Sequence, residues 1–115
     1  MSLKKFSTAA TPPIEFGSNA ANAQARLSTD APSLTAENVA AIAAICDTTT
    51  DHAVRAEHGR DWWPLSLAWS LKDEVPQLPH VVCRPQSTDE VSRLLSYCNS
   101  HNIAVTPSGG RSGVC

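Results

Sequence analysis

The 115-residue sequence lacks several features that would place it in a familiar class at once. No apolar run is long enough to cross a bilayer, so no transmembrane segment is expected. The formal net charge is -2, which leaves no basic surface of the kind that binds nucleic acid. Aromatic residues make up only 5% of the chain, whereas hydrophobic residues reach 42%. This balance is typical of a soluble globular protein with one small domain at most.

The four cysteines form no CxxC pair, so a structural zinc site is not expected and no metal ligands are predicted. There is no secretory signal, which argues against a disulfide framework. We therefore interpret the cysteines as reduced thiols in a cytoplasmic compartment. Cys46 and Cys98 fall on apolar helix faces, where a free cysteine packs as a small hydrophobe.

Residues 1–33 carry little periodic apolar signal and are rich in small polar residues. We interpret them as a flexible leader. Their composition also resembles an organelle transit peptide, but Glu15, Asp30 and the scarcity of arginine argue against that interpretation. Residues 34–115 are interpreted as the N-terminal part of a domain that is truncated in its last loop.

Two stretches have a helical period. Residues 35–46 begin at Thr35, a good N-cap, and continue with apolar residues at helical spacing. The second helix begins at a capping box in which Glu90 follows Ser87 by three residues, and Asn102 is its predicted C-terminal cap. The predicted apolar face of this helix consists of Val91, Leu94, Leu95 and Cys98.

Four segments are predicted to be extended. Residues 51–55 are interpreted as a short strand, and residues 65–71 alternate apolar with small side chains, as a half-buried strand does. Apolar strands at 80–84 and 103–106 flank the second helix, and a short crossover helix implies that they are parallel. The predicted fold class is therefore α+β, with an N-terminal helix and an irregular segment followed by a β-α-β unit.

A glycine-rich loop follows the last predicted strand. Glycines allow positive φ angles and a close approach of the backbone to a ligand, and consecutive amides form a nest for anionic oxygens. Serine hydroxyls add donors, and an arginine adds a fixed charge suited to phosphate. The loop lacks the Walker and GxGxxG patterns, so on these residues alone an ordinary glycine-rich turn remains the alternative. The candidate site residues are Pro107, Ser108, Gly109, Gly110, Arg111, Ser112 and Gly113.

The order of these features resembles the FAD-binding domain of the PCMH-type (vanillyl-alcohol oxidase) flavoenzymes. The matching text is VVCRPQSTDEVSRLLSYCNSHNIAVTPSGGRSGVC, residues 81–115, and a weaker resemblance extends back to Asp51. The resemblance implies that the glycine-rich loop cradles the FAD pyrophosphate. Some members attach FAD covalently through a histidine in this loop, where this chain has Arg111 and Ser112, so non-covalent FAD is expected.

Within that family, the segment HAVRAEHGRDWWPLSLAWSL together with GGRSGVC looks most like the alkyldihydroxyacetonephosphate synthase branch, close to the D-lactate and glycolate dehydrogenases. The implied function is the FAD-binding segment of a flavin-dependent oxidoreductase or of a synthase of that branch. Its partner would be the remainder of the flavoenzyme chain. No catalytic residue is assigned.

Two alternatives remain open. One is a stand-alone, non-enzymatic module that binds phosphate or a nucleotide, and the other is an inactive truncated product. The family pattern has a further glycine after Cys115 and further walls around the flavin. We therefore expect this segment by itself to bind FAD weakly and to be inactive as an enzyme.

Other residues have competing interpretations. The spacing of His52 and His58 matches no metal motif, so a surface or core role is favoured. Pro64 restricts Trp63 to a turn or irregular segment, and hydrophobic anchoring is favoured for the neighbouring tryptophans. Arg84 either faces the flavin site or is a solvated charge at a strand end. Cys115 would lie beside the loop, but nothing in the sequence establishes its reactivity.

Overall fold

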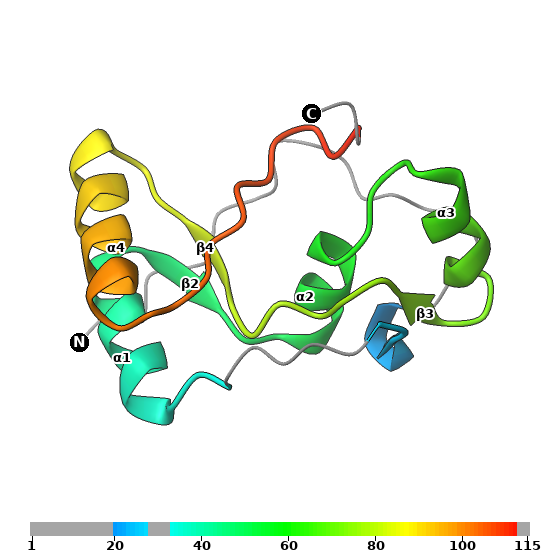
Figure 1. Cartoon of the computed structure of the whole chain (residues 1–115), viewed down its shortest axis with the longest axis horizontal. Helices are drawn as coiled ribbons and strands as arrows, with labels where there is room; N and C mark the ends of the chain where they lie inside the picture. The colour runs from blue at the N-terminus through cyan, green and yellow to red at the C-terminus, as the bar shows by residue number, and fades with distance from the viewer. Residues whose placement is uncertain (1–19, 28–32, 113–115) are drawn as a thin grey trace.

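A computed structural model describes residues 20–27 and 33–112, which form a small α+β arrangement (Figure 1). No helix in these two ranges is long and apolar enough to cross a membrane. Residues 1–19 of the predicted leader lie outside the described residues. The elements, in chain order, are the 3-10 turn η1 (Ala20–Asn22), β1 (Gln24–Ala25), α1 (Ala36–Ile45), β2 (Asp47–Thr49), α2 (His52–His58), α3 (Pro64–Ser70), β3 (Glu74–Val75), β4 (Val82–Arg84) and α4 (Thr88–Ser100).

The two helices predicted from periodicity are confirmed as α1 and α4, which lie side by side next to the β2–β4 pair (Figure 1). Thr35 caps α1 as predicted, because its hydroxyl oxygen accepts a hydrogen bond from the Asn38 N–H at 3.1 Å. Between the helices lies the larger of two hydrophobic cores. Its buried residues are Ile42, Cys46, Leu94 and Cys98.

Both predicted caps of α4 are present. The Ser87 hydroxyl accepts from the Glu90 N–H at 3.1 Å, and the Glu90 carboxylate accepts from the N–H of Gln86, one residue before the N-cap, at 2.7 Å. At the other end, Asn102 has a φ of 59°. The Ile103 N–H donates to the Cys98 carbonyl at 2.9 Å, which closes a Schellman motif.

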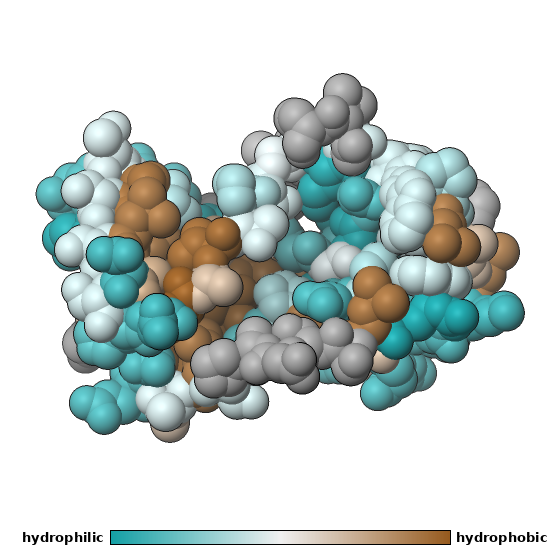
Figure 2. All heavy atoms as spheres, in the orientation of Figure 1, coloured by the Kyte–Doolittle hydropathy of each residue, from teal (hydrophilic) through white to brown (hydrophobic). Residues whose placement is uncertain are grey.

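The apolar face of α4 is only half covered. Leu94 and Cys98 are buried, whereas Val91 and Leu95 are 39% and 49% exposed. Figure 2 shows apolar surface between α4 and the segment that follows it, and Val105 of that segment is also exposed.

The second core surrounds α2 and contains Ala23, Ala56 and Val75. Its Ala23 lies between η1 and β1, and Val75 belongs to β3, which pairs in parallel with β1. Two side chains of α2 form hydrogen bonds with backbone carbonyl groups of other segments. Nε2 of His52 donates to the Ala23 carbonyl at 2.7 Å, and Nε of Arg55 donates to the Pro79 carbonyl at 2.6 Å.

The predicted strand at 51–55 is wrong, because these residues begin helix α2. Asp51 is its N-cap, and the Asp51 carboxylate accepts from the Val54 N–H at 3.0 Å. A capping aspartate satisfies one of the free N–H groups of the first helical turn, which outweighs the weak strand pattern that follows it.

The predicted strand at 65–71 is also wrong, because residues 64–70 form α3. Pro64 occupies the first helical position, where its missing N–H costs nothing and its fixed φ favours the helix. The buried side chains are Ser66 and Ser70, four residues apart, whereas Leu65 and Leu71 are exposed. The alternation of leucine and serine therefore did not indicate a strand with one buried face.

The β-α-β unit is not formed in the described residues. β4 pairs antiparallel with β2, with Asp47 opposite Arg84. Residues 103–106 leave the Schellman turn without pairing to any strand in the part that the structure describes. A strand requires a neighbour whose backbone N–H and C=O groups face it, and here no described strand offers that edge to the segment.

Candidate functional site

The glycine-rich loop crosses above α2 and ends near the connection between α2 and α3 (Figure 1). Gly109 and Gly110 are exposed, and a Cβ added at either would meet no atom within 4 Å. Neither glycine has a φ in the left-handed region, whereas Arg111 does, at 57°. Packing among the described residues therefore does not explain why two glycines stand here.

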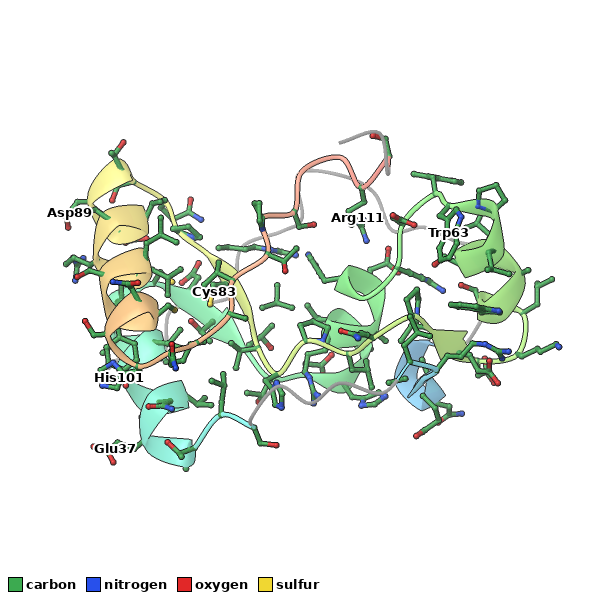
Figure 3. All side chains as sticks on the ribbon, in the orientation of Figure 1. Glu37, Trp63, Cys83, Asp89, His101 and Arg111 are labelled. Atoms are coloured by element: carbon green, nitrogen blue, oxygen red, sulfur yellow. The ribbon has the colours of Figure 1, made fainter. Side chains whose placement is uncertain are left out.

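Arg111 turns inward from the loop, toward α2 (Figure 3). Its side chain is 7% exposed. Nη1 of Arg111 donates to both the backbone carbonyl and the carboxylate of Glu57, each at 2.7 Å. The carbonyl oxygen of Arg111 accepts from the Trp62 N–H at 3.0 Å. The loop is thus held at one residue by both its side chain and its backbone.

Glu57 also pairs with a second arginine, Arg60, which follows the end of α2. Its other carboxylate oxygen accepts from Nη2 and Nε of Arg60, at 2.7 Å and 3.1 Å. The Arg60 and Glu57 side chains are 5% and 14% exposed. We call Arg60, Glu57 and Arg111 the clamp. It combines two guanidinium groups with one carboxylate, so its formal charge is +1, and that charge lies beneath the loop in a site with little water to screen it.

A third arginine, Arg84, interacts electrostatically with Arg111 of the clamp. Burial, followed by the like charge of Arg111, lowers the pKa of the Arg84 guanidinium, whereas the charge of Asp47 opposes this shift. Arg84 ends β4 directly opposite Asp47. One carboxylate oxygen of Asp47, Oδ1, is buried and has no hydrogen-bond partner among the described residues. The positive charges of Arg84 and Arg111 therefore repel each other.

The structure places residues 107–112 of the predicted site in one loop, whereas Gly113 lies outside the described residues, as does Cys115. Arg111 alone among the described loop residues is turned into the protein. Glu57 and Arg60 were not predicted from the sequence. Their signal was an acidic and a basic residue three positions apart at a helix end, and the prediction of a strand at 51–55 hid that spacing.

The two histidines of α2 have structural contacts. His52 bonds to Ala23 as described above, and Nδ1 of His58 donates to the Val54 carbonyl at 2.9 Å. The described residues contain no group of three or more His, Cys, Asp or Glu side chains arranged to hold a metal ion. Trp62 is 51% exposed, and Trp63 packs edge-on against Trp69 with ring centroids 5.7 Å apart.

The described cysteines are free thiols. Burial raises the pKa of Cys83 to about 11, and burial also raises the pKa of Cys98. The Thr48 hydroxyl donates to the Cys83 sulfur at 3.7 Å. Because the thiolate is the reactive form, these raised pKa values leave Cys83 and Cys98 protonated and unreactive at neutral pH.

Comparison with known proteins gives short local similarities. No family model matches the chain, and no solved structure gives a significant match. The chain is 60% identical over 30 residues to the "Probable D-2-hydroxyglutarate dehydrogenase, mitochondrial" of Oryza sativa subsp. indica, covering 26% of this chain and 5% of that protein. It is 50% identical over 34 residues to the "D-2-hydroxyglutarate dehydrogenase, mitochondrial" of Danio rerio, covering 30% of this chain and 6% of that protein.

A third similarity is to the "Glycolate oxidase subunit GlcD" of Bacillus subtilis (strain 168), with 37% identity over 46 residues, which cover 37% of this chain and 10% of that protein. All three matches therefore cover a tenth or less of the relative's own length. They support the predicted relationship to the FAD-linked oxidase superfamily. They do not show the alkyldihydroxyacetonephosphate synthase branch.

Proposed function

We propose that this chain is the FAD-binding segment of a flavin-dependent oxidoreductase that acts on a 2-hydroxy acid, and that residues 107–113 cradle the FAD pyrophosphate. The observation that carries the proposal is the exposed pair Gly109 and Gly110, whose missing side chains leave open space directly above a positively charged clamp. The names of the relatives add the substrate class, because 2-hydroxyglutarate and glycolate are both 2-hydroxy acids. The synthase branch has no such support and is not favoured.

The described loop fits an anionic group through its backbone. Gly109 and Gly110 present N–H groups that no side chain of their own shields, and the exposed Ser108 and Ser112 carry hydroxyl groups. The clamp beneath holds two guanidinium groups close to the loop. Bound FAD would accept the hydride from the substrate, while these residues bind and orient the cofactor. The loop contains no histidine, so the attachment at this position is proposed to be non-covalent.

The proposed partner is the remainder of the flavoenzyme chain, which would supply the walls around the flavin ring. The cytoplasmic location expected from the sequence is a prediction that nothing in the described residues tests. The names of the rice and zebrafish proteins specify mitochondria. Expression of residues 1–33 fused to a fluorescent protein would decide between the two compartments.

The loop is tested by NMR titration of the isotopically labelled chain with ADP, FAD and riboflavin. ADP and FAD carry the pyrophosphate and riboflavin does not. We expect ADP and FAD to shift the amide resonances of Gly109, Gly110 and Ser112, and riboflavin to leave them unchanged. The method detects weak binding, as expected of this segment by itself. If neither ADP nor FAD shifted the loop amides, the pyrophosphate assignment would be wrong.

A matched pair of variants controls for net charge. Gly110→Asp places a carboxylate in the loop at a position where a Cβ meets no described atom, so the fold should persist while the pyrophosphate is repelled. Ser92→Asp adds the same charge on the exposed side of α4. We expect only Gly110→Asp to abolish the ADP-induced shifts.

The oxidoreductase assignment has its own test. The longest natural polypeptide that carries this chain is purified, and its flavin is released by acid denaturation. We expect free FAD in the supernatant and bleaching of the bound flavin by D-2-hydroxy acids under anaerobic conditions. A colourless polypeptide whose loop still responds to ADP would favour the stand-alone nucleotide-binding module instead.

A further inference from the structure

The Arg111 side chain lies in a position that does not suit an arginine in contact with a phosphate. Nη1 of Arg111 points into the protein, where it donates to two oxygens of Glu57 at 2.7 Å each. The side chain is almost completely buried. An arginine that contacted a bound phosphate would have to leave this position and expose the Glu57 carboxylate.

The backbone of Arg111 supports the same conclusion. Its φ of 57° lies in the left-handed region, which is unfavourable for a residue with a Cβ. Such a conformation persists only where surrounding contacts hold it. Here the contacts are the two bonds to Glu57 and the bond from the Trp62 N–H to the Arg111 carbonyl at 3.0 Å. Gly109 and Gly110, which directly precede this left-handed residue, are exposed.

We infer that Glu57 is a positioning residue, which holds the glycine-rich loop in its binding conformation through Arg111, and that Arg111 anchors the loop instead of contacting the phosphate. The inference rests on the proposed function for its ligand, but the anchoring itself requires no ligand. Phosphate oxygens are then met by backbone N–H and serine hydroxyl groups.

The two possible roles of Arg111 predict opposite responses to Glu57→Gln. If Arg111 contacts the phosphate, removal of the competing carboxylate frees the guanidinium, and ADP binds more tightly. If Arg111 is an anchor, the same substitution releases the loop, and ADP binds more weakly. Arg111→Ala weakens binding in both cases, so the response of Glu57→Gln is what separates the two roles.

Anchoring is measured without ligand, by hydrogen exchange of the Trp62 amide. We expect Glu57→Gln and Arg111→Ala each to accelerate this exchange roughly 10- to 100-fold, the range for losing a charge-assisted hydrogen bond. Glu74→Gln is the matched control. It removes the carboxylate from the exposed Arg26–Glu74 pair, whose atoms lie 2.6 Å apart, and should leave Trp62 unchanged.

The Ile103 amide, bonded to Cys98 in the other core, reports whether a variant is still folded. Glu57→Gln leaves two buried guanidinium groups without their carboxylate and could unfold the chain. In that case Arg111→Ala tests the anchoring through Trp62 exchange, because Arg60 still pairs with Glu57 in this variant. Unchanged Trp62 exchange in folded Arg111→Ala, or tighter ADP binding by Glu57→Gln, would overturn the inference. A wild-type chain that protects Trp62 but shows no ADP response would instead refute the proposed function and leave the anchor standing.

Discussion

Replacing Gly59 with alanine tests how closely α2 packs against the segment before β4. A Cβ at Gly59 would lie 2.0 Å from the carbonyl oxygen of Gln77 and 3.2 Å from its carbonyl carbon. The backbone of Gly59 has φ -85° and ψ -3°, which alanine adopts without strain. The glycine is therefore required by the approach of another backbone, and the neighbouring segment must move to admit a methyl group.

That movement should cost stability. Leu78 packs against the second core and the Pro79 carbonyl accepts from Arg55, so displacing Gln77 disturbs both contacts. Overpacking of this kind costs about 1–3 kcal/mol, whereas glycine to alanine at an unhindered site stabilises by about 0.4–1 kcal/mol. We expect Gly59→Ala to lower the free energy of unfolding by about 2 kcal/mol. With a urea m-value of about 1–2 kcal/mol/M, the midpoint should fall by about 1–2 M.

The assay is urea unfolding followed by tryptophan fluorescence, and Gly109→Ala is the matched control. It makes the same chemical change where a Cβ meets nothing within 4 Å, so its effect on stability should stay within about 0.5 kcal/mol. If Gly59→Ala were as stable as the wild type, the close packing of α2 against Gln77 would be refuted.

Two further predictions concern the larger core. Burial raises the pKa of Cys83 from 9.0 to about 11, so below pH 9 both folded and unfolded states keep the proton, and between these values the unfolded state loses it first. The free energy of unfolding should therefore fall between pH 9 and 11, by on the order of 1–2 kcal/mol after solvent screening. Cys83→Ala should make the urea midpoint less dependent on pH over this range. If the midpoint of the variant fell as steeply as that of the wild type, Cys83 would not be the cause. Leu94→Ala, at a residue only 8% exposed, should cost about 2–3 kcal/mol, whereas Leu95→Ala at 49% exposure should cost less than about 1 kcal/mol. Equal losses in thermal or urea unfolding would mean that the face of α4 is assigned incorrectly.

The helix α2 carries most of the contacts that shape the candidate site. His52 bonds to Ala23, Arg55 to Pro79 and Glu57 to Arg111, and Gly59 at the C-cap allows the close approach of Gln77. A seven-residue helix has little stability by itself, so these long-range contacts must hold it in place. The same contacts explain why a change in α2 should reach the glycine-rich loop, which lies far away in the sequence.

Local signals predicted the parts of the fold that local chemistry stabilises. The caps at Thr35 and Ser87 and the left-handed Asn102 all involve residues within a few positions of one another, and each was predicted and confirmed. The glycine-rich loop was predicted from its composition, and the structure adds that its described residues are exposed apart from Arg111. Its ligand remains a prediction.

The sequence by itself determined α1, α4, their caps and the composition of the loop, because short-range hydrogen bonds and the helical period are written in neighbouring residues. Only the tertiary structure decided that residues 52–58 and 64–70 are helices, that β4 pairs with β2, and that Arg111 faces Glu57. The β2–β4 pairing and the Arg111–Glu57 contact join residues distant in the chain, the latter 54 positions apart, and the short helices α2 and α3 have local caps but also need long-range contacts. Pairing over such distances is set by the packing of the whole chain, which no local pattern encodes.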